Sequence, residues 1–236
     1  MATPEARPVA WLADRLAALA TSSRHRPTAM KRVATVLLLA ACGAEDAPVV
    51  SFPDDFRFGA ATAAHQIEGG PNAHNDWGQF ESLDAFAGMT VEPHGDAADG
   101  WRLYEEDADR AAALALDVYR MSLEWGRIEP ERGVFDDAAI AHYRDVLAAV
   151  RARGLDPSVT LHHFTSPIWV QDLRDVDCAD GPSDQNLCGW TNPEVAVAFA
   201  EFVARVAGEY GDLVDEWVTF NEPNVVVLAG YVFGAF

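Results

Sequence analysis

The sequence has little positive charge. Its 236 residues include 17 lysines and arginines against 37 aspartates and glutamates, so the formal net charge is −20. Lys31 is the single lysine. An electrostatic field of this sign repels nucleic acids and anionic lipid surfaces, so we expect neither as a partner.

The sequence also lacks a long apolar run at its amino terminus. Val33–Ala41 is too short to span a bilayer, but Lys31-Arg32 precedes it and Cys42 follows it, an order typical of secretory signals. Leu39-Ala40-Ala41-Cys42 resembles the lipobox of bacterial lipoproteins. That resemblance implies cleavage before Cys42 and acylation of its thiol. We therefore expect an exported protein held to a bacterial membrane, on the periplasmic side or at the cell surface, by a lipid on Cys42.

This interpretation divides the chain into four parts. Residues 1–29 are a non-native or disordered leader, because Met30 is a better start than Met1. Residues 30–41 are the signal peptide, 42–51 a tether and 52–236 the folded domain. The alternative is a chance apolar helix that happens to end in a cysteine.

Cysteine is scarce as well, with three residues in all. Cys178 and Cys188 flank a polar stretch containing Asp and Gly, and their Cys-x9-Cys spacing suits a disulfide that closes a local loop. Disulfides persist outside the cytoplasm, which agrees with export. No histidine lies between or beside them, so a metal site is disfavoured, and two free thiols are the alternative. We expect no metal and no organic cofactor.

What is present is enough apolar material for one large core, since half of the residues are hydrophobic. Apolar strand patterns alternate with amphipathic helix patterns from Phe52 onward. The strands are expected at 57–64, 117–125, 156–163 and 216–223, and the helices at 101–116, 136–153 and 192–210. This rhythm predicts parallel βαβ units with right-handed crossovers. The irregular stretch up to Gly100 is too long for an ordinary connection, so we expect it to be functional.

The last strand pattern, Glu216–Pro223, delivers a carboxylate to its tip. Pro223 cannot continue the ladder, and the residue before a proline favours extended dihedrals, so we expect Glu222 to be the extended last residue of the strand. Parallel α/β folds place their chemistry at such carboxyl ends.

Other polar side chains occupy the same position on their strands. Each has a structural explanation on its own: His163 as a hydrogen-bonded core histidine, Gln66 as a loop residue and Arg120 as part of an ion pair with a carboxylate. In a (β/α) barrel, however, the carboxyl ends of all strands share one mouth. We therefore predict a single site. Its members are Gln66, Arg120, His163, Asn221 and Glu222.

From Phe52 to its end the chain resembles the amino-terminal half of glycoside hydrolase family 1, the β-glucosidase and β-galactosidase family. The matching stretches are Phe52-Pro53, Phe58–Gly69, Tyr119–Ser122 with Trp125, Arg127 and Ile128, Thr160–His163 before Pro167, Gly189–Pro193, and Thr219–Pro223. The resemblance implies an α/β fold, the (β/α)8 TIM barrel, of which about the first four βα units fit in this chain.

The resemblance also implies the role of each site residue. Glu222 matches the general acid/base of a retaining mechanism, and Asn221 the residue that contacts the 2-hydroxyl of the sugar. Gln66 and His163 match residues that grip the non-reducing sugar, and Arg120 matches the arginine that supports the nucleophile. His162 is then expected to be structural. The implied substrates are β-linked glucosides, galactosides or oligosaccharides.

Two departures from the family pattern matter. Phe164 stands where many members have tryptophan, which leaves the sugar preference open, and the chain contains no Thr-Glu-Asn-Gly, the stretch that carries the nucleophile. The first hypothesis is therefore a fragment of a retaining β-glycosidase that is inactive without its carboxy-terminal half-barrel. The alternative is a non-catalytic, surface-anchored half-barrel that binds sugar and associates with itself. A third hypothesis, an inverting glycosidase, would pair Glu222 with another acid near a strand end: Glu68, Glu124 or Glu129.

Overall fold

The computed structural model describes residues 51–70, 74–83, 92–175 and 178–233. The predicted leader, signal peptide, acylated Cys42 and almost all of the tether lie outside the described residues. The chain divides after Asp54 into two units, and the second, Asp55–Phe236, holds the fold that follows. Within the described residues, no helix combines the length and apolar character needed to cross a membrane.

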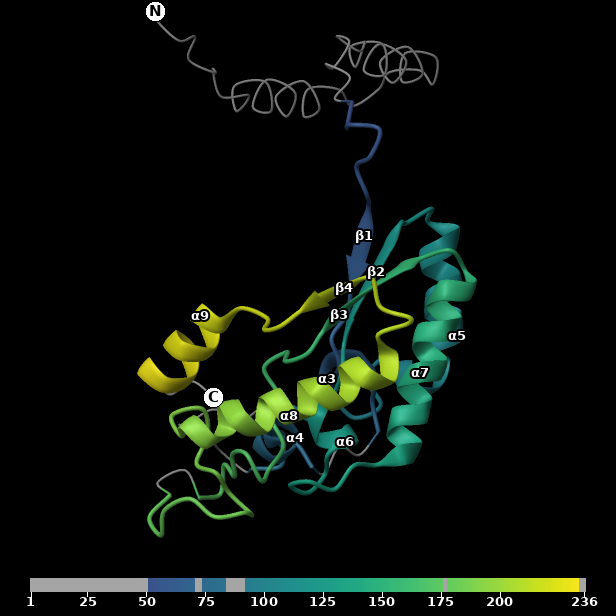
Figure 1. Ribbon diagram of the computed structural model, residues 1–236. Coiled ribbons are helices and arrows are strands. Elements are labelled where there is room, and N and C mark those ends of the chain that lie inside the picture. Colours follow the sequence, from purple (N-terminus) through teal and green to yellow (C-terminus); the bar gives the residue numbers. More distant parts are fainter. Residues whose placement is uncertain (1–50, 71–73, 84–91, 176–177, 234–236) are drawn as a thin grey trace, which may run out of the picture. The chain divides into compact units, whose positions relative to one another are not determined.

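Four strands form one parallel sheet, as the alternating pattern predicts (Figure 1). They are β1 (Gly59–Ala61), β2 (Val118–Ser122), β3 (Asp156–Thr160) and β4 (Glu216–Val218), hydrogen-bonded in the order β1-β2-β3-β4. Every neighbouring pair is parallel and consecutive in the sequence. The described chain is thus built from four consecutive βα units, whose strands all end on the same side.

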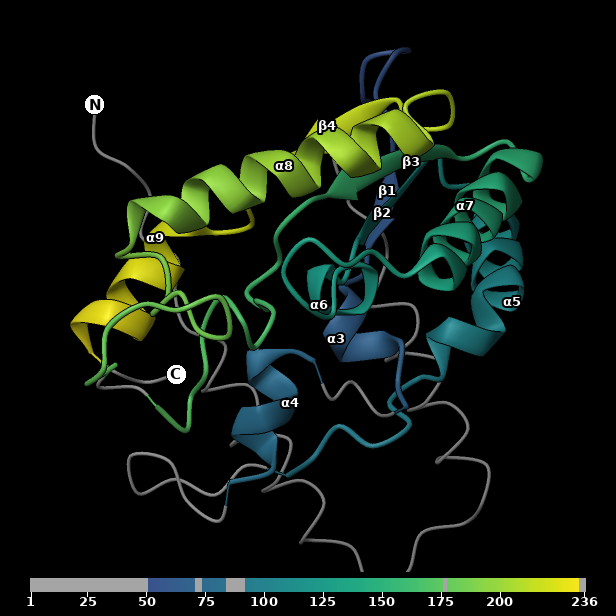
Figure 2. The same ribbon diagram turned by 60° about the horizontal axis from the view of Figure 1, so that its bottom comes forward.

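Three long helices connect the strands and cover one face of the sheet (Figures 1 and 2). They are α5 (Gly100–Ala113), α7 (Asp137–Ala152) and α8 (Pro193–Tyr210). The amphipathic patterns predicted over 136–153 and 192–210 are confirmed, because α7 and α8 each bury a stripe of five large side chains. All ten of these side chains are buried: Ile140, Tyr143, Val146, Leu147, Val150, Val195, Phe199, Phe202, Val206 and Tyr210.

Side-chain caps and a glycine mark the ends of these helices. Asp136 caps α7 by accepting hydrogen bonds from two backbone N–H groups of the first turn, and Asn192 caps α8 in the same way at Glu194. Gly154 ends the α7 segment with φ +77°, a left-handed conformation that glycine adopts without strain.

The core lies between the sheet and these helices. Trp125 is 1% exposed, and its ring lies 5.2 Å from that of Phe202 and 5.4 Å from that of Trp169. Burial of a large apolar side chain contributes roughly 1.5–3 kcal/mol, so this cluster fixes α8 against the end of β2.

Three short helices follow the carboxyl ends of the strands (Figure 2): α3 (Ala64–Ile67), α4 (Asp76–Glu81) and α6 (Trp125–Ile128). The sequence patterns predicted strand at Ala64 and Trp125 and irregular chain at α4, and these predictions were wrong. The first predicted helix also ends early, at Ala113.

The strands are shorter than predicted at their carboxyl ends. β3 stops at Thr160 instead of His163, and β4 stops at Val218, where its register with Thr160 also ends. A strand lasts only as long as its ladder, so the polar residues beyond these points lie in turns. Because these residues lie beyond the strands, their side chains need not alternate between the two faces of the sheet.

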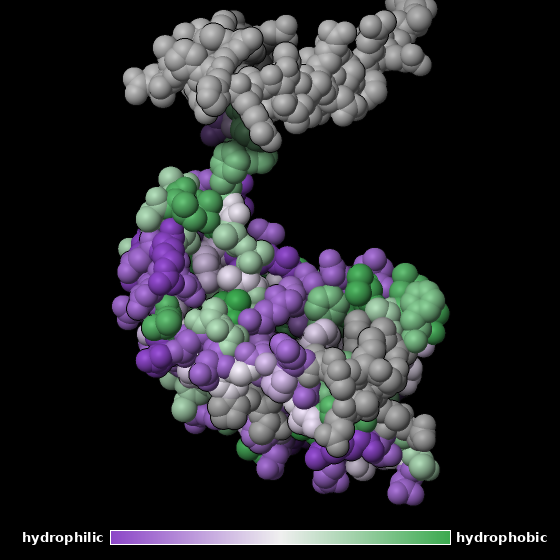
Figure 3. All heavy atoms as spheres, turned by 180° about the vertical axis from the view of Figure 1, so that it is seen from behind, coloured by the Kyte–Doolittle hydropathy of each residue, from purple (hydrophilic) through white to green (hydrophobic). Residues whose placement is uncertain are grey.

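Apolar side chains are exposed on the last described turns, α9 (Pro223–Val225) and the π-helix Val226–Val232 that continues it. Val232 is 61% exposed and Phe233 76% exposed. This segment, at the left of Figure 1, forms a green area at the right-hand edge of Figure 3.

Candidate active site

Arg120 and Asn221 bring the ends of β2 and β4 together. The Nη2 group of Arg120 donates to Oδ1 of Asn221 at 2.9 Å, and its Nε donates to Oγ1 of Thr160, at the end of β3, at 3.0 Å. The structural alternative for Arg120, an ion pair with a carboxylate, is wrong among the described residues, where its guanidinium binds a hydroxyl and an amide oxygen. The guanidinium of a β2 residue therefore binds groups that follow or end the next two strands, β3 and β4.

His163 lies beside this group, three residues beyond β3. Its half-buried side chain has an Nδ1 atom that finds no hydrogen-bond partner among the described residues. Burial lowers the pKa of His163, and the positive charge of Arg120 lowers it further. A neutral imidazole donates through one nitrogen and accepts through the other, a chemistry that suits a sugar hydroxyl.

Asn221 and Glu222 sit in a turn after β4. The backbone N–H of Asn221 donates to the carbonyl of His162 at 2.9 Å, which ties the turn to the end of β3. Glu222 is not extended as predicted, because its φ of 46° and ψ of 57° are left-handed. It caps α9, whose first residue is Pro223, a favourable first position for proline.

This backbone at Glu222 is strained, at a cost of about 1–3 kcal/mol for a residue with a Cβ. The strained turn leaves the carboxylate exposed and places its side chain outside the alternation that would have separated it from Asn221. In place of the predicted extended strand end, the chain makes a tight turn into α9.

Gln66 is exposed in α3, directly after β1. Its neighbour Ala64 donates its backbone N–H to Oγ of Ser122 at 2.8 Å, which attaches α3 to the end of β2. Hydrogen bonds therefore join Arg120 to Asn221, and Asn221 to the segment that carries His163. Gln66 and Glu222 lie at the same end of the sheet because the strands are parallel.

His162 is structural, as the sequence indicated. It is 1% exposed, its ring stacks on Phe220 with centroids 4.1 Å apart, and its Nε2 lies 3.2 Å from Oγ of Ser166. Trp190 packs edge-on against both rings. Burial lowers the pKa of His162 to about 3, with a further contribution from His163, so the side chain stays neutral. This aromatic stack supports the turn that carries Asn221.

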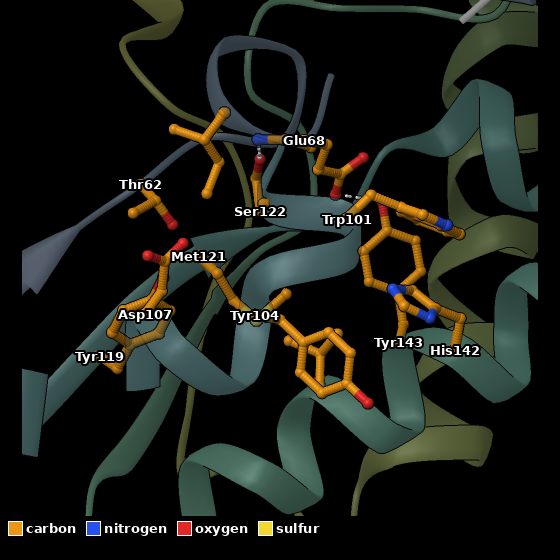
Figure 4. Close-up of a pocket in the computed structure, with 14 residues that line it drawn as sticks. Thr62, Glu68, Trp101, Tyr104, Asp107, Tyr119, Met121, Ser122, His142 and Tyr143 are labelled. Atoms are coloured by element: carbon orange, nitrogen blue, oxygen red, sulfur yellow. Dashed lines mark hydrogen bonds between the residues drawn. The ribbon is translucent and has the colours of Figure 1, made fainter. Parts of the chain in front are cut away.

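The three acids considered as catalytic partners of Glu222 are buried, and each is hydrogen-bonded to a core side chain. Glu68 accepts a 2.6 Å hydrogen bond from Tyr143 and pairs with Arg127 at 2.9 Å (Figure 4). Burial raises the pKa of Glu68 to about 7, although Arg127 opposes the shift. Glu124 accepts from Thr165 at 2.9 Å, and Glu129 accepts from the indole of Trp125 at 2.7 Å.

Glu68 also lines the cavity that Figure 4 shows, between the first two strands and helices α5 and α7. Its volume is about 30 Å³. Ligand pockets usually measure roughly 300–1,000 Å³, so this cavity is a packing gap in the core and cannot hold a sugar.

The sequence patterns missed a cluster beside Gln66. His65, Glu81 and His94 place their ligand-type atoms within 4.8 Å of one another. Their positions, 16 and 13 residues apart, form no short metal motif, and Glu81 belongs to the helix that was not predicted. Two imidazoles and a carboxylate are a donor set that could hold a divalent cation.

Cys178 and Cys188 form a disulfide, with their Cα atoms 5.8 Å apart. It closes the loop that precedes Trp190 and α8. The disulfide thus closes the loop just before Trp190, whose ring packs against His162 and Phe220.

Comparison with known proteins relates this arrangement to one family. The model of glycosyl hydrolase family 1 matches residues 49–236. A coniferin beta-glucosidase from Pinus contorta is 34% identical over 196 residues, covering 79% of this chain and 34% of that protein. A beta-galactosidase from Pyrococcus woesei is 29% identical over 221 residues, covering 77% and 43%. The chain thus spans about a third to two fifths of the length of these curated relatives.

Solved structures agree with the sequence relatives. The beta-glycosidase BGL167 is 41% identical, with a TM-score of 0.64, covering 76% of this chain and 39% of that one. A beta-glycosidase from Pyrococcus horikoshii is 34% identical, with a TM-score of 0.65, covering 78% and 39%. The predicted fold class is confirmed: the parallel sheet and its helices correspond to part of a TIM barrel. On both the sequence match and the shared fold, the chain belongs to glycosyl hydrolase family 1.

Proposed function

We propose that the chain is the amino-terminal half of a retaining β-glycosidase of the β-glucosidase type. Its substrates would be β-linked glucosides, galactosides or oligosaccharides, and Glu222 would be the general acid/base. Family membership supports the reaction class, and the names of the relatives, beta-glucosidase and beta-galactosidase, support the substrate class.

The observation that carries the proposal is the hydrogen bond from Arg120 to Asn221. It uses the amide oxygen of Asn221, so the Nδ2 hydrogens are left to donate to a sugar hydroxyl beside Glu222. His163, which is partly exposed, and the exposed Gln66 would bind hydroxyls at the far side of the same ring. Neutral amides and imidazoles suit vicinal hydroxyls, because each can donate and accept.

Glu222 would act twice in the reaction. As an acid it would protonate the departing glycosidic oxygen while a second carboxylate attacks the anomeric carbon, and as a base it would then take a proton from water. In retaining enzymes the two carboxyl groups lie about 5–5.5 Å apart. We assign the second carboxylate to the part of the barrel beyond these four units, because this sequence has no Thr-Glu-Asn-Gly. The 236-residue chain would then bind sugar without cleaving it.

We further propose export and lipid attachment at Cys42. The disulfide between Cys178 and Cys188 supports an oxidising compartment. In a bacterial host, the chain should partition into the membrane fraction, and its mature amino terminus should carry an acylated Cys42 by mass spectrometry. Cys42→Ser should abolish both. An unmodified Cys42 preceded by residues 30–41 in the wild-type product would contradict the proposal.

A second candidate function is a non-catalytic half-barrel that binds sugar as a pair of copies. The exposed apolar side chains after β4 favour it, because Leu228, Val232 and Phe233 would be covered in a dimer. Sedimentation of the chain decides: a stable sugar-binding dimer favours this function, whereas a monomer that gains activity with a carboxy-terminal half favours the first.

The role of Glu222 is tested in a barrel completed with the carboxy-terminal half of a family member. Glu222→Gln should lower kcat/KM for an alkyl β-glucoside by roughly 10²–10⁴, because the leaving oxygen then lacks its proton donor. With a dinitrophenyl glucoside, whose leaving group needs no proton, the rate of the first, bond-breaking step should fall much less.

The matched control is Glu216→Gln, which changes an exposed glutamate at the start of β4 and should leave both rates unchanged. Equal losses with both leaving groups, or no loss in Glu222→Gln, would refute the assignment.

A further inference from the structure

His65 is held by both ends of α4, the helix that the sequence did not predict. Its Nδ1 lies 3.2 Å from Nδ2 of Asn75, the N-cap residue of α4, and its Nε2 lies 2.9 Å from Oε1 of Glu81, the last residue of α4. The imidazole is buried, at 8% exposure. His94 approaches the other carboxylate oxygen of Glu81 at 2.5 Å.

The tautomer of His65 follows from one backbone hydrogen bond. The N–H of Gly78 can only donate, and it lies 2.7 Å from the Asn75 side chain, so the Asn75 atom facing it is the carbonyl oxygen. The atom facing His65 is then the NH₂ group, which also can only donate. Nδ1 of His65 must therefore accept, and the ring proton lies on Nε2, where it is donated to Glu81.

This tautomer decides between two interpretations of the cluster. A histidine that ligates a metal through one nitrogen normally donates its other N–H to an acceptor. Here the other nitrogen of His65 faces a donor, and the nitrogen that faces Glu81 carries the proton. The spacing of His65, Glu81 and His94 is thus that of a hydrogen-bonded network and not of a metal centre.

The same helix also holds the loop after β3. Asp76 receives the backbone N–H of Ser166 on its carboxylate and donates its own N–H to the carbonyl of Ser166, both at 2.9 Å. Ser166 follows His163 by three residues. The amino end of α4 therefore contacts the two segments that carry Gln66 and His163, and Figure 2 shows α4 beside α3.

We propose that His65, in its Nε2–H form, is a positioning residue that fixes Gln66 for sugar binding, with α4 as a clamp between the segments that follow β1 and β3. Gln66 is exposed and follows His65 directly in α3. Loss of the two hydrogen bonds of His65 would therefore let α3 rotate and move the Gln66 side chain. This inference rests on the proposed function for the role of Gln66, whereas the tautomer itself does not.

The first test is the tautomer, read from long-range ¹H–¹⁵N correlations of the full ¹⁵N-labelled chain. The His65 signals are identified by their loss in His65→Gln. A proton on Nε2 is expected, and a proton on Nδ1 would overturn the proposal. Zn²⁺ titration gives a second reading: tight binding that His94→Asn removes would mean a metal centre and would also overturn it.

The second test separates positioning from stability. Asn75→Ser keeps an oxygen to cap Gly78 but removes the donor to His65. We expect the affinity of the folded variant for methyl β-glucoside, measured by NMR titration of the full chain well below its unfolding temperature, to fall about tenfold. Glu81→Gln, which retains an acceptor for Nε2–H, should keep more of the affinity than Glu81→Ala.

Gln66→Ala is the reference for loss of the sugar contact. If Gln66→Ala weakens binding and Asn75→Ser does not, the positioning role is wrong and the proposed function stands. If the wild-type chain binds no glycoside, the proposed function fails and with it the role of Gln66, while the tautomer spectrum still decides whether the α4 clamp exists.

Discussion

Asn221 is the most constrained of the candidate site residues. Its backbone N–H is bound by the carbonyl of His162 and its side-chain oxygen by Arg120, so two neighbouring strand ends determine where its remaining amide hydrogens point. Glu222 follows in a left-handed turn that costs about 1–3 kcal/mol. A strained residue held between well-bound neighbours is typical of a functional site.

His162 makes the fold sensitive to acid. Burial lowers its pKa from 6.5 to about 3, so the folded chain keeps it neutral where the unfolded chain protonates it. Stability from this residue is complete above pH 6.5 and is lost as the pH falls from 6.5 toward 3, at about 1.4 kcal/mol per pH unit.

We predict that the free energy of unfolding, measured by urea titration, falls more steeply below pH 6.5 in the wild type than in His162→Asn. The comparison is needed because Glu68 acts in the opposite direction. Its raised pKa, about 7, adds stability that is complete below 4.5 and lost as the pH rises through 7. Parallel pH profiles for wild type and variant would show that His162 is not buried as described.

At the scale of elements, Tyr143 of α7 connects the first two βα units. Its hydroxyl accepts the backbone N–H of Glu124 at 3.0 Å and donates to Glu68 at 2.6 Å (Figure 4). Removing the hydroxyl leaves a buried N–H and a buried carboxyl oxygen without this partner. Such groups cost about 1–3 kcal/mol each when unsatisfied.

Tyr143→Phe should therefore lower the free energy of unfolding by about 2 kcal/mol or more. Tyr210→Phe is the matched control, because the equally buried Tyr210 donates one hydrogen bond, to the carbonyl of Ile140. Its loss should be about 1 kcal/mol. Denaturant unfolding of the two variants measures the difference, and equal losses would contradict the bridging role of Tyr143.

The long elements were predictable because their signals are repeated. The buried stripe of α8 recurs over five turns, and Asn192-Pro193-Glu194 marks its start, so no single residue decides the assignment. β2 and β3 were located by alternation and apolar runs. Alternation did not locate their carboxyl ends, because a strand ends where its pairing partner ends. The pairing of Thr160 with Val218 cannot be predicted from either segment alone.

The short elements depend on contacts between distant segments. α4 has six residues, and its capping Asn75 and terminal Glu81 both bind His65 from another segment. No periodic pattern of that length separates it from a loop. The candidate site residues were predicted from residue type and position at strand ends, whereas the turn at Glu222 and the partners of Arg120 depend on contacts between distant segments.

At the scale of the molecule, the four βα units form one sheet whose strands all end on the same side, and the sheet has two edges. β1 and β4 are the outer strands of the described sheet, and both are partly or fully exposed. A TIM barrel closes by pairing such edges, and its site draws residues from many strands. Under the proposed function, the candidate site would hold sugar-binding groups and one exposed carboxylate, and the nucleophile would belong to strands that these four units do not include.

The central claim is that this polypeptide supplies the proton donor of a two-carboxylate mechanism and not the nucleophile. The most direct measurement is release of nitrophenol from 4-nitrophenyl β-glucoside and β-galactoside by the purified 236-residue chain. We predict no release above the rate in buffer, with the wild type and Glu222→Gln indistinguishable. Sustained turnover by the wild type that Glu222→Gln abolishes would contradict the claim.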